Sequence, residues 1–309
     1  MIRSILSAQS KIIEVYHREQ KKNFIEVIYG DDAMKIFQGT KLGFRFTDKF
    51  LTNQTLSRLY GAYNDSSLSK RKIKKCADLL KIDLDELEKS LSEFTSFNDF
   101  FTRTLKPEAR PIDSLPNSFS SPGDGRLLVF PKLDDDLLSY VKWAPIRLKD
   151  LFQHDEALIK RYRDGACGIL RLCPTDYHRF HFPVKGKAGI TRTIKGVLHS
   201  VSPYTLENKV PVYTLNKRTV CEVETASYGK VLLMEVGALF VGGIMQTYRP
   251  GYEVNKGEEK GFFKFGGSTC IFFLQKGVME FDEDLIFQSK LGRETYVKMG
   301  EKIGTLKAK

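Results

Sequence analysis

The sequence predicts an α+β protein in which a basic, mostly helical N-terminal region precedes a β-rich domain. Leucines at helical spacing before residue 93 and short apolar runs after residue 122 indicate the two halves. Charge separates them as well: residues 1–81 hold 16 Lys and Arg against 8 Asp and Glu, and the remainder holds 33 against 30. The chain has 309 residues, 41% of them hydrophobic, which is enough for a substantial folded core.

The N-terminal region begins with two β-like runs, IIEVY and FIEVI, between Lys11 and Tyr29. The charged segment between the runs predicts a hairpin. From about Asp31 to Glu93 the pattern becomes helical. The apolar residues that repeat there are Leu79, Leu80, Ile82, Leu84, Leu87 and Leu91. Pro107, Pro111, Pro116 and Pro122 then break any helix, so we expect one region over 1–95 and a second over 96–309.

The second region alternates short runs rich in Val, Ile, Leu and Phe with Gly, Pro and Asn, which predicts strands. The predicted strands are GILRL, GVLHSV, TVCEVET, KVLLMEVGALFVGGI and STCIFFLQ. The run Cys270 to Leu274 is apolar on both faces, so it should be an interior strand.

Several classes of protein are disfavoured. The longest apolar run, Val231 to Ile244, contains Glu235, and the N-terminus lacks the apolar stretch of a secretory signal. Five cysteines without a CxxC spacing argue against disulfides or a zinc finger and favour reduced thiols in the cytoplasm. The sequence contains no GxxxxGK[ST] loop and no GxGxxG motif after a strand, so it gives no support for a nucleotide-binding fold.

Three short segments can carry chemistry: Ser121–Gly125, Asp176–His181 and Phe265–Thr269. Taken singly, Asp124 and Ser268 suit ordinary turns. His178 and His181 lack a third ligand nearby, so we expect no metal. Together the segments supply the Ser, His and Asp of an activated nucleophile. A hydrolase is one reading, although no GxSxG elbow surrounds the serine.

The Gly267–Ser268 bond suggests another use of the same nucleophile. Glycine leaves its carbonyl unhindered, so Ser268 Oγ could attack that carbonyl and convert the amide into an ester. β-Elimination would then cut the chain, and loss of ammonia from the resulting dehydroalanine would leave a pyruvoyl cap. Such a ketone can form a Schiff base with a substrate amine and accept electrons.

These residues resemble the phosphatidylserine decarboxylase family. FGGST together with DYHRFH is highly specific for that family. The resemblance extends to Phe97–Arg103, to Lys106-Pro107 with Arg110–Asp113, to Tyr228-Gly229 and Val236–Ala238, and to Lys256–Glu258. It covers residues 95–280 well, and the first 90 residues resemble one bacterial branch more loosely. The sequence departs from the family at Gly123 and at Lys142–Pro145.

The resemblance implies self-cleavage between Gly267 and Ser268, giving a β chain (1–267) and an α chain (268–309) headed by a pyruvoyl group made from Ser268. Asp124 and His181 match the family's charge-relay pair, in which His181 deprotonates Ser268. His178 matches the histidine of the decarboxylation step. The activity implied is decarboxylation of phosphatidylserine to phosphatidylethanolamine, with the substrate amine held as a Schiff base.

Such a substrate stays in an anionic bilayer, which gives the basic N-terminal region a purpose. We therefore expect a peripheral protein on the cytoplasmic face of the cell membrane, without nucleic acid as a partner. The resemblance also suggests a homodimer. Two alternatives stay open: a Ser-His-Asp lipid hydrolase or esterase, and a non-enzymatic basic protein that binds anionic lipid or nucleic acid.

Overall fold

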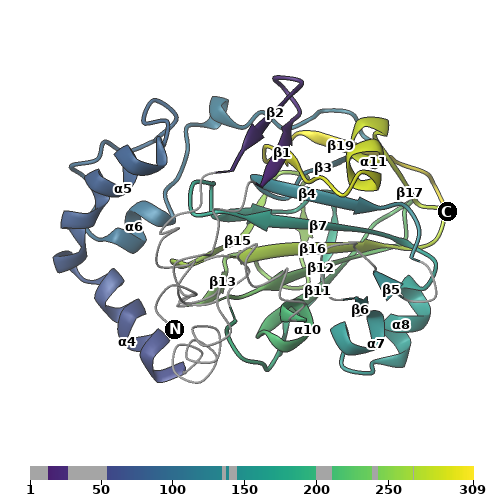
Figure 1. The fold of residues 1–309 in the computed structure, drawn as a ribbon. Helices are drawn as coiled ribbons and strands as arrows, with labels where there is room; N and C mark the ends of the chain where they lie inside the picture. The colour runs from purple at the N-terminus through teal and green to yellow at the C-terminus, as the bar shows by residue number, and fades with distance from the viewer. Residues whose placement is uncertain are drawn as a thin grey trace, which may run out of the picture.

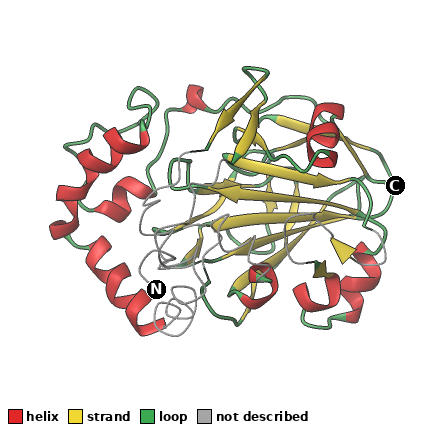
Figure 2. Ribbon diagram, viewed as in Figure 1, coloured by secondary structure: helices red, strands yellow, loops and turns green. Residues whose placement is uncertain are grey.

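A large central sheet with helices around its ends and edges makes up the fold (Figures 1 and 2). The computed structural model describes residues 13–26, 54–133, 137–138, 145–199, 211–238, 243–266 and 268–309. Helices and mixed sheets together confirm the predicted α+β architecture.

The main sheet has eleven strands, with β16 near its middle. Its order is β14 (Glu253–Val254), β9 (Gly186–Ala188), β11 (Arg218–Glu224), β12 (Lys230–Val236), β16 (Ser268–Leu274), β7 (Ala166–Leu172), β4 (Gly125–Phe130), β18 (Thr295–Val297), β1 (Glu14–His17) and β2 (Lys22–Ile25), and β10 (Arg192–Ile194) also pairs with β11. Every residue of β16 is buried between β12 and β7. The predicted interior strand is thereby confirmed.

Three smaller sheets surround the main one. They are β13 (Ile244–Gln246) with β15 (Glu259–Phe263) and β8 (Arg179–His181), β17 (Met279–Phe281) with β19 (Lys302–Leu306) and β3 (Ser118–Ser120), and β5 (Leu137–Leu138) with β6 (Ile146–Arg147). The first of them bears on function, because β8 carries His181 and the chain leaves β15 only five residues before Ser268.

The N-terminal helices lie together at one end of the molecule, on the left in Figure 1. They are α4 (Gln54–Asp65), the 3-10 helix η2 (Ser67–Lys72), α5 (Ile73–Leu80) and α6 (Phe97–Phe101), followed by the 3-10 helix η3 (Pro107–Ala109). Their buried side chains form a hydrophobic cluster separate from the main core. Helices α7 (Leu148–Leu151), α8 (Glu156–Tyr162), α10 (Val212–Leu215) and α11 (Glu283–Lys290) complete the described elements.

The N-terminal elements differ from the prediction in one place. The predicted hairpin is confirmed as β1 and β2, which extend the main sheet through β18. The helix predicted to continue to Glu93 ends instead at Leu80, because Lys81 adopts a left-handed conformation with φ 51°. The part of that prediction covering residues 31–53 lies outside the described residues.

The predicted strands of the second region are largely confirmed. GILRL, TVCEVET and STCIFFLQ coincide with β7, β11 and β16, and the first part of the long apolar run forms β12. The exception is GVLHSV, whose described part forms only an isolated bridge between Val197 and Asn216. The five cysteines are free and buried. Within the described ranges, none of the helices has the length and apolarity needed to cross a bilayer.

Candidate active site

Ser268 is the first residue of β16, so the main sheet fixes its position. It pairs with Leu172 of β7, and the next residue, Thr269, pairs with Val236 of β12. The Ser268 side chain is fully buried, and its Oγ lies 3.4 Å from Nδ1 of His178. A hydroxyl held in a rigid strand beside an imidazole is the arrangement of an activated nucleophile. Gly267 lies outside the described residues.

His178 is held so that its free nitrogen faces this hydroxyl. Its Nε2 lies 2.9 Å from the carbonyl oxygen of Cys173, which can only accept, so Nε2 carries the proton and Nδ1 presents a lone pair. The ring stacks on Phe101 with 3.9 Å between centroids. Burial lowers the pKa of His178 well below its usual value, and the positive charges of Arg103 and Arg126 lower it further. The imidazole is therefore neutral at pH 7 and can accept a proton.

His181 lies in β8 and is also buried. Its backbone N–H donates to the carbonyl of Pro122 at 2.7 Å, and its ring stacks on Tyr177. Its Nδ1 has no hydrogen-bond partner. Burial lowers the pKa of His181 to about 4, while the carboxylates of Glu259 and Asp124 act in the opposite direction. Among the described residues, no hydrogen bond joins His181 to Ser268 or to Asp124.

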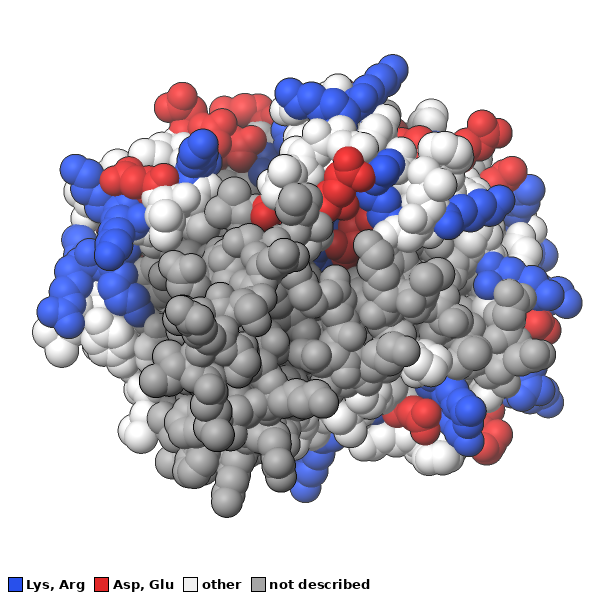
Figure 3. All heavy atoms as spheres, viewed as in Figure 1, with Lys and Arg blue, Asp and Glu red and all other residues white. Residues whose placement is uncertain are grey.

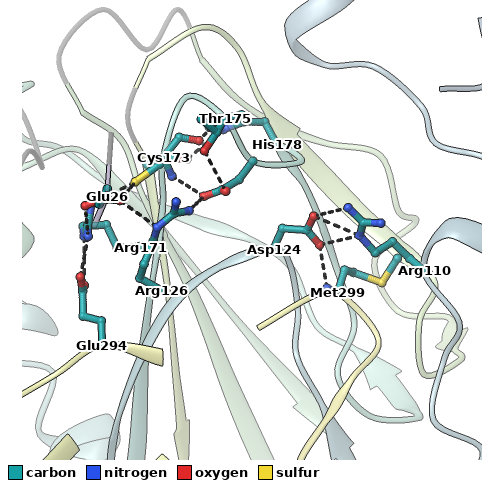
Figure 4. A network of polar contacts seen from close by, with 12 residues as sticks. Glu26, Arg110, Asp124, Arg126, Arg171, Cys173, Thr175, His178, Glu294 and Met299 are labelled. Atoms are coloured by element: carbon teal, nitrogen blue, oxygen red, sulfur yellow. Dashed lines mark hydrogen bonds and ion pairs between the residues drawn. The ribbon is translucent and has the colours of Figure 1, made fainter. Parts of the chain in front are cut away.

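Asp124 is held by Arg110 and the backbone (Figure 4). Arg110 donates to it from Nε at 2.9 Å and from Nη2 at 2.6 Å, and the backbone N–H of Met299 donates at 2.8 Å. Asp124 acts on His181 through its charge at longer range. A cavity of about 430 Å³ lies beside Asp124, Arg103 and Tyr177. The structure thus brings Ser268 together with His178, whereas among the described residues the predicted pair of Asp124 and His181 is linked only through charge.

A buried network of ion pairs supports the loop that carries His178 (Figure 4). Glu26, next to β2, pairs with Arg126 of β4 at 2.8 Å and with Arg171 of β7 at 2.9 Å. Arg171 also pairs with Glu294, and Arg126 with Asp176. The loop joins this network through Cys173 and Asp176, because the Cys173 thiol donates to Glu26 and the Cys173 N–H donates to Asp176. Because the backbone carbonyl of Cys173 also accepts a hydrogen bond from His178 Nε2, the network fixes the orientation of that imidazole.

A second buried ion pair links two sheets near His181. Lys260 of β15 contacts Glu235 of β12 at 2.9 Å, and both side chains are almost fully buried. Thr219 and Gln246 donate to the same carboxylate, and Lys260 donates to the amide oxygen of Gln246. The pair therefore ties the small sheet that carries His181 to the strand beside β16.

The two networks contain residues that sequence reasoning did not single out as functional. A single charged residue inside an apolar strand indicates a buried ion pair, because a buried charge requires a partner. The strands β4, β7 and β12 carry such residues: Arg126, Arg171 and Glu235. The partners of Arg171, Glu26 and Glu294, lie 145 and 123 residues away from it in sequence. Sequence spacing gave no means of finding them.

Comparisons with known proteins identify the family of this chain. The sequence profile of the family described as "Phosphatidylserine decarboxylase" matches residues 97–305. A protein of Clostridium perfringens (strain ATCC 13124) is 44% identical over 293 residues, covering 95% of this chain and 99% of that protein. A protein of Clostridium botulinum (strain Langeland) is 43% identical over 96% of this chain and 100% of its own length, and one of Desulfitobacterium hafniense (strain Y51) is 42% identical over 95% and 98%. Each is named phosphatidylserine decarboxylase proenzyme. The chain belongs to the phosphatidylserine decarboxylase family.

Proposed function

We propose that this chain is a proenzyme that cuts itself between Gly267 and Ser268 and then decarboxylates phosphatidylserine to phosphatidylethanolamine. The observation that carries the proposal is the buried Ser268 Oγ facing Nδ1 of His178, in a chain of this family. Asp124, His178, His181 and Ser268 are the proposed catalytic residues. The products of cleavage are a β chain, 1–267, and an α chain, 268–309.

The self-cleavage uses groups of this chain and one molecule of water. Ser268 Oγ loses its proton to a histidine and attacks the Gly267 carbonyl carbon; the C–N bond breaks, and the Ser268 nitrogen takes up a proton as the ester forms. Removal of the Ser268 α-proton then breaks the Cβ–O bond, which releases Gly267 as a carboxylate and leaves dehydroalanine. Tautomerisation to an imine and addition of water release ammonia and leave a pyruvoyl group.

The position of Ser268 supports the formation of such a group. The atoms that would become the pyruvoyl group are those of Ser268, which are buried at the start of an interior strand and lie beside a neutral imidazole. Once formed, the group supplies a ketone carbonyl that can hold the substrate amine and take up the electrons left by CO2. Nδ1 of His178 faces the same atoms, so a proton that it takes up there can be returned at the same point.

The sheet supports retention of the α chain after cleavage. All seven residues of β16 pair with β7, and six pair with β12. The strand is buried along its whole length, so the 42 residues from 268 to 309 keep their contacts when the covalent link is lost.

The substrate class supports a location at an anionic membrane surface, on its cytoplasmic face, and we propose a homodimer there from the resemblance. Lysine and arginine side chains gather at the left end of the face in Figure 3, where Figure 1 places α5. Lys70, Arg71, Lys74 and Lys75 are exposed there. Positive groups of this kind attract acidic lipid headgroups.

An intact-mass measurement combined with a denaturing gel tests the proposal. Active protein should give two chains, the smaller of 42 residues (268 to 309) and without a free N-terminal amine. The Ser268→Ala variant should stay a single chain and release no CO2 from phosphatidylserine vesicles. A single intact chain from active wild-type protein would refute self-cleavage. Labelling of Ser268 by a fluorophosphonate in that protein would point to the hydrolase alternative.

A further inference from the structure

The segment just before the proposed cleavage site is held by the N-terminal helices, not by the catalytic sheet alone. Phe265 stands three residues before Ser268, and its backbone N–H donates to Asn98 Oδ1 of α6 at 2.9 Å. Lys264 pairs with Asp65 of α4, also at 2.9 Å. Asn98 donates in turn to Asp65 at 2.9 Å. Two consecutive residues are thus bound by one pair of linked side chains from two helices.

The Phe265 ring is enclosed by the same helices. It packs edge-on against Phe97 and Phe101, with 5.0 Å between ring centroids in each case. Tyr60 of α4 approaches it at 6.0 Å. The ring also packs against the separate hydrophobic cluster of the N-terminal helices.

Lys72 occupies the centre of this aromatic group. Its ammonium lies 4.7 Å from the ring centroid of Phe97, 4.8 Å from that of Tyr63, 5.0 Å from that of Tyr60 and 5.9 Å from that of Phe265. It donates to Asn64 Oδ1 at 2.7 Å. Cation–π attraction is stronger when the cation is partly removed from water. Lys72 differs here from its neighbours Lys74 and Lys75, which are exposed.

Helix α6 contacts both the segment before Ser268 and the histidine that faces it. Phe101 of this helix packs edge-on against Phe265 and stacks on His178. Between Phe265 and Ser268 the chain passes through Gly266, whose φ of 143° is a conformation that other residues rarely adopt. Holding Phe265 therefore fixes the point at which the chain enters Gly266.

We propose that Lys72, Asn98 and Asp65 are positioning residues for self-cleavage, which hold Lys264 and Phe265 so that the Gly267 carbonyl is presented to Ser268. Intramolecular attack is fast only when the reacting groups are kept in one geometry. Lys72 and Asn98 carry most of this effect, because Lys264 and Asp65 are 30% and 45% exposed and such pairs contribute little. The inference rests on the proposed self-cleavage.

The test compares self-cleavage in Lys72→Met, Lys72→Arg and the matched control Lys89→Met. Lys89 lies in the same N-terminal segment and also contacts a ring, that of Phe94, but it does not touch Phe265. We expect Lys72→Met to slow cleavage of freshly made chain about tenfold, and Lys72→Arg, which keeps a cation among the rings, to restore most of the rate. Lys89→Met should cleave like wild type.

A second measurement separates positioning from general stability. Decarboxylation per pyruvoyl-bearing chain, measured after cleavage is complete, should stay within about twofold of wild type in Lys72→Met. Cleavage at the wild-type rate in Lys72→Met would overturn the inference, and so would an equal loss of cleavage and of turnover per pyruvoyl. Wild-type chain that is active without being cut would instead refute the proposed function.

Discussion

At the scale of single residues, the two histidines of the site differ in their electrostatic surroundings. Both are buried, which lowers the pKa of each. Arg103 and Arg126 lower the pKa of His178 further, whereas Glu259 and Asp124 oppose the decrease at His181. A base becomes stronger when a carboxylate stabilises its protonated form, so His181 is the stronger base. His178 has the closer contact with Ser268, although 3.4 Å is long for a hydroxyl hydrogen bond.

We therefore expect different losses from the two alanine variants. His181→Ala should leave the chain uncut, because the stronger base is gone. His178→Ala should cut partially yet lose decarboxylation, because His178 adjoins the atoms that become the pyruvoyl group. A gel measures cleavage and CO2 release measures turnover. An uncut His178→Ala chain would assign deprotonation of Ser268 to His178, and wild-type turnover in that variant would contradict its role.

The pH dependence of self-cleavage offers an independent check. With a pKa of about 4, His181 stays neutral and able to accept a proton well below pH 6.5. Cleavage after a jump from pH 7.5 to 5.5 should therefore proceed at nearly the same rate. An ordinary histidine with a pKa near 6.5 would lose about tenfold over the same interval. A tenfold loss between these pH values would show that a histidine with an ordinary pKa limits the reaction.

At the scale of elements, the hairpin of β1 and β2 is joined to the catalytic strands by charge. Burial would raise the pKa of Glu26, but Arg171 and Arg126 outweigh it and lower the pKa to about 2, from an ordinary 4.5. Because the pKa is depressed in the folded state, Glu26 stabilises the fold fully above pH 4.5. That contribution is lost as the pH falls from 4.5 towards 2.

Replacing Glu26 by Gln should lower the free energy of unfolding by about 3–5 kcal/mol at pH 7, because it leaves two buried guanidinium groups short of a counter-charge. Urea unfolding of the uncut Ser268→Ala chain measures this without the complication of two chains. Glu14→Gln is the matched control: Glu14 lies in the same hairpin and pairs with Arg293, but it is half exposed. Its replacement should cost less than about 1 kcal/mol. Equal losses in the two variants would contradict the importance of burial.

The elements also show what a sequence reveals and what it leaves open. An interior strand at Cys270–Leu274 was predictable, because apolar residues on both faces can only be buried on both sides. The end of α5 was not, since Lys81 carries no side-chain signal for a left-handed conformation. Ser268 and His178 were candidates because of their motifs, and the structure places their side chains in contact. The position of Lys72 among aromatic rings was not predictable, because its ring contacts come from residues up to 193 positions away.

At the scale of the whole molecule, the N-terminal region has more than one role. Its hairpin extends the main sheet, and its helices contact the segment before Ser268. The division into regions 1–95 and 96–309 stays a prediction. The positive charge of the region is likewise divided, because Lys72 faces inward while Lys74 and Lys75 face solvent. Only the exposed cations remain available for a membrane surface.

The exposed lysines predict how the molecule should bind to membranes. Each lysine near an anionic leaflet contributes about 1 kcal/mol, so Lys74→Ala with Lys75→Ala should weaken binding to phosphatidylserine vesicles by up to about thirtyfold. Sedimentation with vesicles at low salt measures the effect, which should shrink as salt is added. Lys307→Ala with Lys309→Ala removes the same charge at the opposite end of the molecule, near the C-terminus in Figure 1. If both pairs weakened binding equally, net charge would explain the attraction, and α5 would have no special part in docking.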